Sequence, residues 1–256
     1  MSSWEAFLTG LIQGLTEFFP VSSSAHLKLF KLMIGAETSE SHVIFDLMCH
    51  LGTLCALLYF LRRDLIDLFR FERKKIALLF LATLPLVPLY FLLKPVRDFA
   101  SQPQYLGFCL CVTGLILYLG DKVRLRQLES SPRISDALWI GTMQAAALIP
   151  GISRSGSTIA CARVLGWGPR DAVRFSFLLA IPTIIGGNSL ELLRLVLKDE
   201  IGSVSFSSCL IAFASALIVG LLVIRTAFRW LERGNLKPFA IYCASIGLFA
   251  IIYLNI

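Results

Sequence analysis

Charge is scarce in this chain. Only 16% of its 256 residues are charged, whereas 56% are hydrophobic and the mean hydropathy is +0.75. A water-soluble domain of this length does not need so apolar a composition, which therefore indicates an integral membrane protein. The net charge of +7 lies largely in the segments between apolar stretches and requires no nucleic-acid partner.

The chain also lacks paired cysteine motifs and a basic leader. Its seven cysteines include no Cys-x-x-Cys pair and fall mainly in or beside apolar stretches, which is typical of small core residues rather than disulfides or metal ligands. The opening residues, Met1 to Glu5, include no Lys or Arg, and the sequence runs on through Glu17 and His26. This pattern argues against a cleaved signal peptide.

Six stretches are apolar and long enough to cross about 30 Å of hydrocarbon as helices. They are residues 43–61, 76–93, 105–119, 173–197, 207–224 and 239–254. The second and fourth contain prolines, which membrane helices tolerate when neighbouring groups satisfy the freed backbone. The sequence therefore predicts an all-α polytopic membrane protein with six transmembrane helices.

Two further apolar stretches, 4–34 and 136–166, contain polar patches and break at Pro20 and Pro150. Irregular backbone at membrane depth persists only where it is buried in protein or lines a watery cavity. Two such segments can shelter each other at the centre of a membrane protein. We therefore predict that both stretches are re-entrant helical hairpins.

A weak internal repeat relates the two halves of the chain. Aligning Pro20 with Pro150 also pairs Phe45 with Phe175. Each half then contains one hairpin and three spans, and an odd number of crossings forces the second copy to insert upside down. The pattern predicts an inverted-topology repeat with its functional site near the midplane. The copies cover about residues 1–120 and 135–256 of a single integral-membrane domain.

Lysines and arginines are distributed unevenly between the two sides of the membrane. With both termini on one side, the opposite side receives 17 of the 24 basic residues, and the side of the termini receives 6. The 17 lie in the segments 62–75, 120–137, 163–174 and 225–238. Because short cytoplasmic loops are enriched in Lys and Arg, both termini are predicted to face outward.

The polar patches contain ionisable groups, each of which costs at least ~2.5 kcal/mol inside a membrane segment. Such groups are therefore expected to have a partner or a function. The first patch provides the carboxylate of Glu17, the imidazole of His26 and three consecutive serine hydroxyls. The second provides the guanidinium of Arg154 with hydroxyls and glycines, which is typical of a phosphate cradle. Helical spacing puts Gln13 on the face of Glu17, and Thr158 on the face of Arg154.

A helix that starts after Pro20 begins with hydroxyls, so Ser22, Ser23 or Ser24 is expected to cap it. The N-terminus of this helix and that of the helix in the second hairpin would then form an anion-binding site. Phosphate is the expected ligand beside Arg154. A hydroxyl near a base and a phosphate clamp is the layout of nucleophilic phosphoryl transfer. A purely structural buried network is the alternative interpretation of these charges.

At these residues the chain resembles the undecaprenyl pyrophosphate phosphatase family of the bacitracin-resistance type (UppP/BacA), over essentially its whole length. The motifs that carry the resemblance are Gln13 to Glu17 with Pro20-Val21-Ser22-Ser23, and Pro150-Gly151-Ile152-Ser153-Arg154-Ser155-Gly156-Ser157-Thr158. The resemblance implies hydrolysis of undecaprenyl pyrophosphate to the monophosphate carrier lipid and phosphate, for cell-wall lipid recycling. It also implies a bacterial inner-membrane location and a site that opens to the periplasm.

The resemblance further implies catalytic roles and a cofactor. The implied catalytic residues are Glu17, Ser23, His26 and Arg154. We expect substrate contacts from Gln13, Ser22, Ser153, Ser155 and Thr158. A divalent cation, Mg²⁺ or Ca²⁺, is implied to assist.

Two positions depart from the family pattern. Gln13 stands where many members carry a second Glu, and His50 stands where relatives often have Gln. The first change removes a carboxylate that could bind a metal, so direct ligation, with Glu17 as the candidate ligand, stays open. We assign no role to His50 from the sequence.

Three mechanisms and two protein classes remain open at this stage. Ser23 is the favoured nucleophile with Glu17 or His26 as its base, and the alternatives are attack by His26 itself or by water that Glu17 activates. The competing class is a transporter or flippase for an anionic lipid or phosphate, because inverted repeats with broken helices are common in transporters. The expected partners are the polyprenyl pyrophosphate substrate and membrane lipids, and the oligomeric state is open, with a homo-oligomer among the options.

Overall fold

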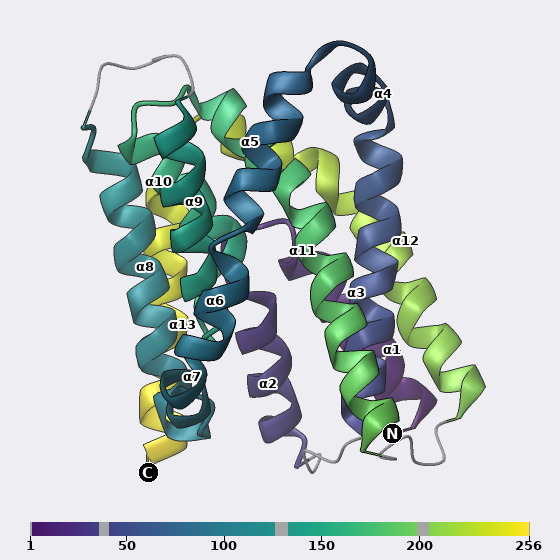
Figure 1. The fold of residues 1–256 in the computed structure, drawn as a ribbon. Helices are drawn as coiled ribbons and strands as arrows, with labels where there is room; N and C mark the ends of the chain where they lie inside the picture. Colours follow the sequence, from purple (N-terminus) through teal and green to yellow (C-terminus); the bar gives the residue numbers. More distant parts are fainter. Residues whose placement is uncertain (1, 36–40, 126–132, 199–204, 256) are drawn as a thin grey trace.

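The chain forms a bundle of helices that run mostly along one direction (Figure 1). The computed structural model describes residues 2–35, 41–125, 133–198 and 205–255, and within these residues it is helical without strands. The helices are α1 (Ser3–Thr16), α2 (Ser23–Met33), α3 (Ser41–Phe60), α4 (Arg62–Phe71), α5 (Arg73–Thr83), α6 (Leu86–Leu92), α7 (Lys94–Ala100), the 3₁₀ turn η1 (Pro103–Tyr105), α8 (Leu106–Lys122), α9 (Ile134–Ala146), α10 (Arg154–Val164), α11 (Pro169–Leu197), α12 (Phe206–Glu232) and α13 (Lys237–Asn255).

Six helical segments of the described chain are long and apolar enough to cross a membrane, which confirms the six predicted spans. They are Val43–Phe60, Arg73–Leu92, Pro103–Lys122, Pro169–Leu197, Phe206–Glu232 and Lys237–Asn255. The third is longer than the expected 105–119, because η1 and the polar end of α8 extend it. The protein is therefore an all-helical, multi-pass membrane protein.

The prolines have different effects in the second and fourth spans. The second span breaks into α5 and α6 at Pro85, where the chain makes a turn. By contrast, α11 continues through Pro182 as one helix of 29 residues. A proline removes one backbone donor, so continuity depends on whether neighbours satisfy the freed carbonyl.

Two shorter helix pairs lie among the long helices. The pair α1–α2 extends into the bundle from the end that holds both termini, and α9–α10 extends inward from the opposite end (Figure 1). The turns of both pairs lie inside the bundle and touch, since Ser155 Oγ lies 3.3 Å from the carbonyl oxygen of Phe19. Polar segments distant in the sequence thus meet in the interior.

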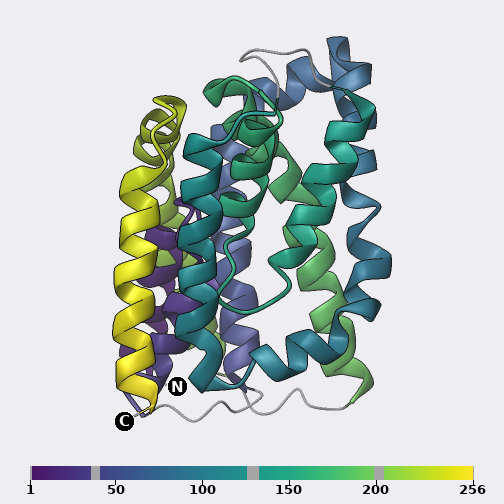
Figure 2. The same ribbon diagram turned by 90° about the vertical axis from the view of Figure 1, so that its left-hand side faces the viewer.

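Small residues allow the supporting helices to approach closely. A Cβ atom on Gly10 of α1 would lie 1.8 Å from Ser215 Oγ of α12, and one on Gly52 of α3 would lie 2.4 Å from the carbonyl oxygen of Phe213. A second tight pair, α8 and α13, lies side by side (Figure 2). Membrane helices commonly associate through such small-residue contacts.

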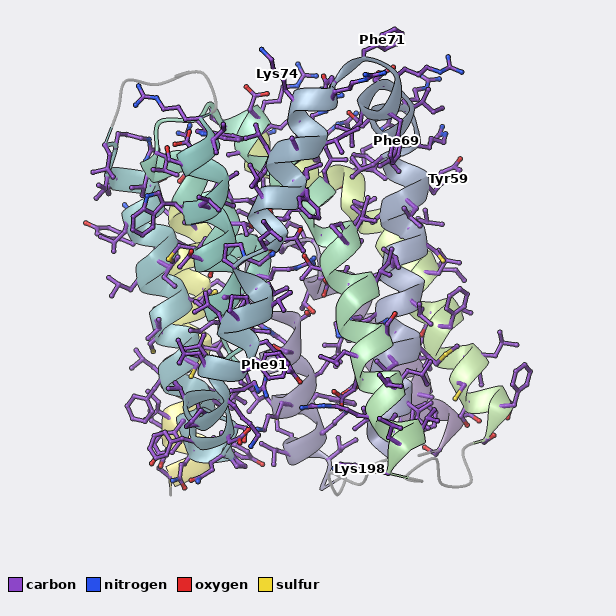
Figure 3. All side chains as sticks on the ribbon, viewed as in Figure 1. Tyr59, Phe69, Phe71, Lys74, Phe91 and Lys198 are labelled. Atoms are coloured by element: carbon purple, nitrogen blue, oxygen red, sulfur yellow. The ribbon has the colours of Figure 1, made fainter. Side chains whose placement is uncertain are left out.

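The segment 62–75, which we expected to be a loop, is helical. Charged and apolar residues at helical spacing form α4, whose Asp64 pairs with Arg174 of α11. The rings of Phe69 and Phe71 are 71% and 78% exposed, so α4 has the amphipathic character of an interfacial helix. It lies at the end of the bundle opposite Lys198 (Figure 3).

Candidate active site

A cavity of about 360 Å³ lies where the two inner turns meet α3 and α11. Both polar patches contribute to its wall, together with polar side chains of the two spans. The polar lining residues are Glu17, Ser22, Ser23, Ser24, Asp46, His50, Ser153, Arg154, Ser155, Thr183, Asn188 and Glu191. The cavity therefore gathers polar side chains at a site among predominantly apolar helices.

The carboxylate of Glu17 is the centre of the hydrogen-bond network. It is only 8% exposed, and its Oε1 lies 2.5 Å from Nη2 of Arg154. Its Oε2 accepts from Ser23 Oγ at 2.7 Å and from Gln13 Nε2 at 2.9 Å. The carboxylate therefore pairs with one guanidinium and accepts from two further side-chain donors.

The first turn places Ser23 at the start of α2 in an unusual backbone geometry. Ser22 precedes it at φ 68° and ψ 86°, a left-handed conformation that costs a non-glycine residue on the order of 1–3 kcal/mol. Our capping prediction is wrong for this helix, because Ser22 makes no side-chain cap and its hydroxyl lies 3.3 Å from that of Ser24. A capping residue ordinarily has an extended backbone, and the left-handed conformation of Ser22 departs from that geometry.

The second turn is conventionally capped and anchored. Ser153 Oγ accepts from the backbone N–H of Gly156 at 3.1 Å, which caps α10 immediately before Arg154. Thr113 of α8 accepts from the Ser153 backbone N–H at 3.1 Å and donates to the Gly151 carbonyl at 2.8 Å. Sequence reasoning missed Thr113, for which the only signal is an isolated hydroxyl in an apolar span.

Two of the expected substrate-contact residues do not line the cavity. Gln13 is fully buried behind Glu17, where Nε2 contacts both that carboxylate and His50 Nδ1, the latter at 2.8 Å. Thr158 is also buried, donates to the Arg154 carbonyl at 3.0 Å and lies 2.7 Å from Ser176 Oγ. Both therefore position the residues that face the cavity, whereas Ser22, Ser153 and Ser155 belong to its wall.

His26 also lies away from the cavity. Its Nδ1 is 2.8 Å from the carbonyl oxygen of Ser22, and its Nε2 is 2.9 Å from the hydroxyl of Tyr242 on α13. The two rings stack with centroids 5.7 Å apart and an interplanar angle of 5°. The sequence offered no signal for Tyr242, because the contact joins residues 216 positions apart.

Comparison with known proteins places the chain in a family. The family model described as "Bacitracin resistance protein BacA" matches residues 6–249, which is nearly the whole chain. The chain belongs to the BacA family. This assignment agrees with the resemblance seen in the two motifs.

Curated relatives of this BacA family member match it over nearly their full lengths. An undecaprenyl-diphosphatase from Protochlamydia amoebophila is 42% identical over 255 residues, which cover 99% of each chain. Undecaprenyl-diphosphatases from Desulforudis audaxviator and Halothermothrix orenii are 38% and 34% identical, and the matches cover 98% and 100% of both chains. The similarity therefore extends over both inner turns and all six spans.

The described residues of this BacA family member do not fit a metal centre made by the protein alone. Among them, no three His, Cys, Asp or Glu side chains are grouped closely enough to hold an ion. Glu17, the candidate ligand, already has protein donors on both oxygens. The other cavity carboxylates pair with basic residues, Asp46 with Lys31 at 2.6 Å and Glu191 with Arg194 at 3.3 Å.

Proposed function

We propose that this chain is an integral-membrane phosphatase that hydrolyses undecaprenyl diphosphate to undecaprenyl phosphate and inorganic phosphate. The observation that carries the proposal is the contact of Ser23, Glu17 and Arg154 in one cavity among membrane spans. These side chains supply a nucleophile, a base and a phosphate clamp. The activity named for the full-length relatives supports the same substrate.

Ser23 is the nucleophile in this proposal, and Glu17 is its base. The hydroxyl of Ser23 already donates to Glu17 Oε2 at 2.7 Å, within the range for direct proton transfer. The Ser23 oxygen bonds to the terminal phosphorus, the bridging P–O bond breaks, and Glu17 takes the hydroxyl proton. Undecaprenyl phosphate leaves, and Arg154 stabilises the charge on the transferred phosphoryl group.

The second half of the reaction restores the enzyme. After Glu17 has released its proton to solvent, water attacks the phosphoserine, and Glu17 transfers a water proton to the Ser23 oxygen. Inorganic phosphate then leaves. We route no step through a divalent cation, because the residues present do not form a site for it. The cofactor that the resemblance implies is tested by whether chelation with EDTA abolishes turnover.

The geometry favours serine over the two alternative attacking groups. Both ring nitrogens of His26 contact Ser22 and Tyr242, so attack by this imidazole would require breaking those contacts. Direct attack by water activated by Glu17 would require Ser23 to give up its hydrogen bond to the same carboxylate oxygen. In our proposal His26 instead positions the turn through Ser22.

We also propose that α1–α2 and α9–α10 are re-entrant hairpins of an inverted-topology repeat within one membrane domain. Their turns lie inside the bundle after approach from opposite ends, which supports this arrangement (Figure 1). It would put the diphosphate near the midplane and leave the prenyl chain in the bilayer, between spans. Membrane lipids would surround the exposed apolar faces.

The proposed location is the bacterial inner membrane, with both termini and the cavity opening on the periplasmic side. Support comes from the basic segments 62–75 and 225–238, which lie at the end opposite the termini (Figure 1). In a background without the native cysteines, Asp67→Cys should be protected from an impermeant thiol reagent in intact cells. Gln102→Cys should react, and the reverse pattern would contradict this orientation.

Phosphate release in detergent tests the proposed function. Purified protein in micelles has no second compartment, so an enzyme releases phosphate from undecaprenyl diphosphate, whereas a transporter or flippase does not. Arg154→Ala, purified as folded protein, should release none and controls for contaminating phosphatases. Absence of release by the unmodified protein, with and without Mg²⁺ or Ca²⁺, would overturn the proposal.

A further inference from the structure

His50 is a cavity residue for which the proposed mechanism has no role. It lies on α3, one edge of its ring faces the interior, and the side chain is 29% exposed. Its Nδ1 lies 2.8 Å from Gln13 Nε2 and 3.9 Å from Glu17 Oε2. The ring therefore lies directly beside the base of the proposed reaction.

The orientation of the Gln13 amide can be assigned from its neighbours. The amide nitrogen Nε2 lies 2.9 Å from Glu17 Oε2, and the ionised carboxylate can only accept hydrogen bonds. A flipped amide would place its oxygen against that carboxylate oxygen, with two acceptors in contact. The amide nitrogen must therefore face Glu17, although this leaves Gln13 Oε1 buried with no partner among the described residues.

This amide orientation determines the protonation of His50. Gln13 Nε2 carries two hydrogens, and one is donated to Glu17. The other faces His50 Nδ1 at 2.8 Å, so Nδ1 must accept and carry no proton. A neutral imidazole with an unprotonated Nδ1 carries its proton on Nε2.

The Nε2–H group is then free to act in the cavity. Gln13 covers the Nδ1 edge of the ring, and no side chain or carbonyl among the described residues accepts a hydrogen bond from Nε2. Arg154 lines the same cavity, and its Nη1 is also buried without a partner among the described residues. His50 and Arg154 therefore each have a donor without a partner among the described residues. The donor of Arg154 is cationic, and that of His50 is neutral.

We infer that His50 binds the diphosphate of the substrate as a neutral Nε2–H donor, and that Gln13 fixes this tautomer. The inference rests on the proposed function and adds a substrate-binding residue to it. A neutral donor lets His50 contact phosphate oxygens without forming a strong ion pair with Glu17, which must stay available as the base. Arg154 supplies the positive charge that attracts the diphosphate, and the single N–H donor of His50 orients the diphosphate.

A tautomer measurement tests the first half of the inference without enzyme turnover. The chain has three histidines, so ¹⁵N-histidine spectra of the full protein in micelles are simple, and His50→Gln assigns the His50 signals. We expect an unprotonated Nδ1 and a protonated Nε2 for His50. A protonated Nδ1 would overturn the assignment, even if every variant were inactive.

Kinetics with undecaprenyl diphosphate test the second half. His50→Phe keeps ring volume without a donor and should lower kcat/KM about 10- to 100-fold, as expected for one hydrogen bond to a charged group. His50→Gln offers an acceptor to Gln13 and a donor to phosphate, and should stay within roughly threefold of the unmodified enzyme. Cys55→Ala, at an exposed position of the same helix, is the matched control and should not change turnover.

The outcomes separate this inference from the proposed function. If the unmodified protein releases no phosphate, the proposed function is wrong. If it is active and His50→Phe retains its full kcat/KM, only the role of His50 is wrong. A folded His50→Gln that is as impaired as His50→Phe would likewise overturn the donor role.

Discussion

The turn between α9 and α10 is fixed by hydrogen bonds that do not involve Glu17, whereas the turn between α1 and α2 contains Glu17 and Ser23, which bond directly to each other. Thr113 fixes the second turn at Gly151 and Ser153, and the Ser153 side chain caps α10. The first turn lacks a side-chain cap, and Glu17 connects it to Ser23 and across to the second turn. We call the second turn the cradle, because in our proposal it binds phosphate, and the first turn the reactive tip, because it contains Glu17 and Ser23.

In our proposal, neither the cradle nor the reactive tip contains all the groups that phosphoryl transfer requires. The cradle has a guanidinium and a capped helix N-terminus but no base, and the reactive tip has a carboxylate and a hydroxyl but no cation of its own at the contact. Arg154 and Glu17, 2.5 Å apart, link the two turns through an ion pair. Before substrate arrives, this pair neutralises two buried charges that would each be costly inside a membrane.

Removal of the proposed nucleophile from the reactive tip should have the largest effect on turnover. Ser23→Ala should lower kcat by at least about a thousandfold, because Ser23 is the one hydroxyl that donates to Glu17 among the described residues. His26→Phe should lose far less, because its ring contacts Ser22 and Tyr242 rather than the cavity. Rates of phosphate release by the folded variants in detergent provide the measurement.

Chemical trapping provides the control for this prediction. Enzyme quenched during turnover should carry an acid-stable, base-labile phosphate on serine, and Glu17→Gln should not accumulate it. An acid-labile label on histidine would contradict our assignment. The absence of any label, combined with an inactive Glu17→Gln, would favour direct attack by water.

The next largest effect should come from changing the shape of the cation in the cradle. Arg154→Lys should reduce kcat/KM about a hundredfold, because a point charge replaces a planar group with several donors. The rate of phosphoryl transfer should fall, whereas the thermal stability of the protein in detergent should change little. Turnover near that of the unmodified enzyme would mean that charge alone is sufficient at this tip.

Much of the fold could be predicted because it follows from local composition. Runs of apolar residues indicate the six spans, and the charges of 62–75 indicate the boundary between the first two, although the helicity of this segment was missed. The prolines were harder, since breaking at Pro85 and continuity through Pro182 depend on neighbouring helices.

The site was predictable only as far as its motifs reach. Glu17, Ser23 and Arg154 come from the two polar patches, and the structure brings them together. By contrast, His26 and Thr158 belong to the same two patches yet do not line the cavity. A side chain's direction on a helix depends on what packs against it, and those contacts come from distant parts of the chain.

A stability experiment tests how tightly α8 confines the backbone of the second turn. Gly151 has φ 102°, and a Cβ atom there would lie 2.4 Å from Cys109 Cβ. Gly35 has φ 65° with nothing within 4 Å of an added Cβ, so it is a matched control for backbone strain alone. Gly35→Ala should cost about 1–2 kcal/mol, and Gly151→Ala should cost a further 1–3 kcal/mol from the clash. Thermal unfolding in detergent checks the order, and equal losses would mean that α8 does not confine this turn.

The smallest expected effects concern the serines that precede the two inner helices. Ser153→Ala should destabilise the protein by about 1 kcal/mol, because its hydroxyl accepts from the Gly156 N–H. Ser22→Ala should change stability little, because the Ser22 side chain makes no cap. Ser22→Gly should leave stability unchanged or raise it by up to about 1 kcal/mol, because glycine adopts positive φ without the steric penalty. Reduced turnover in both folded Ser22 variants would indicate that the Ser22 hydroxyl, which lines the cavity, contributes to the reaction. A loss of stability in Ser22→Ala equal to that in Ser153→Ala would instead contradict the distinction between a capped cradle and an uncapped reactive tip.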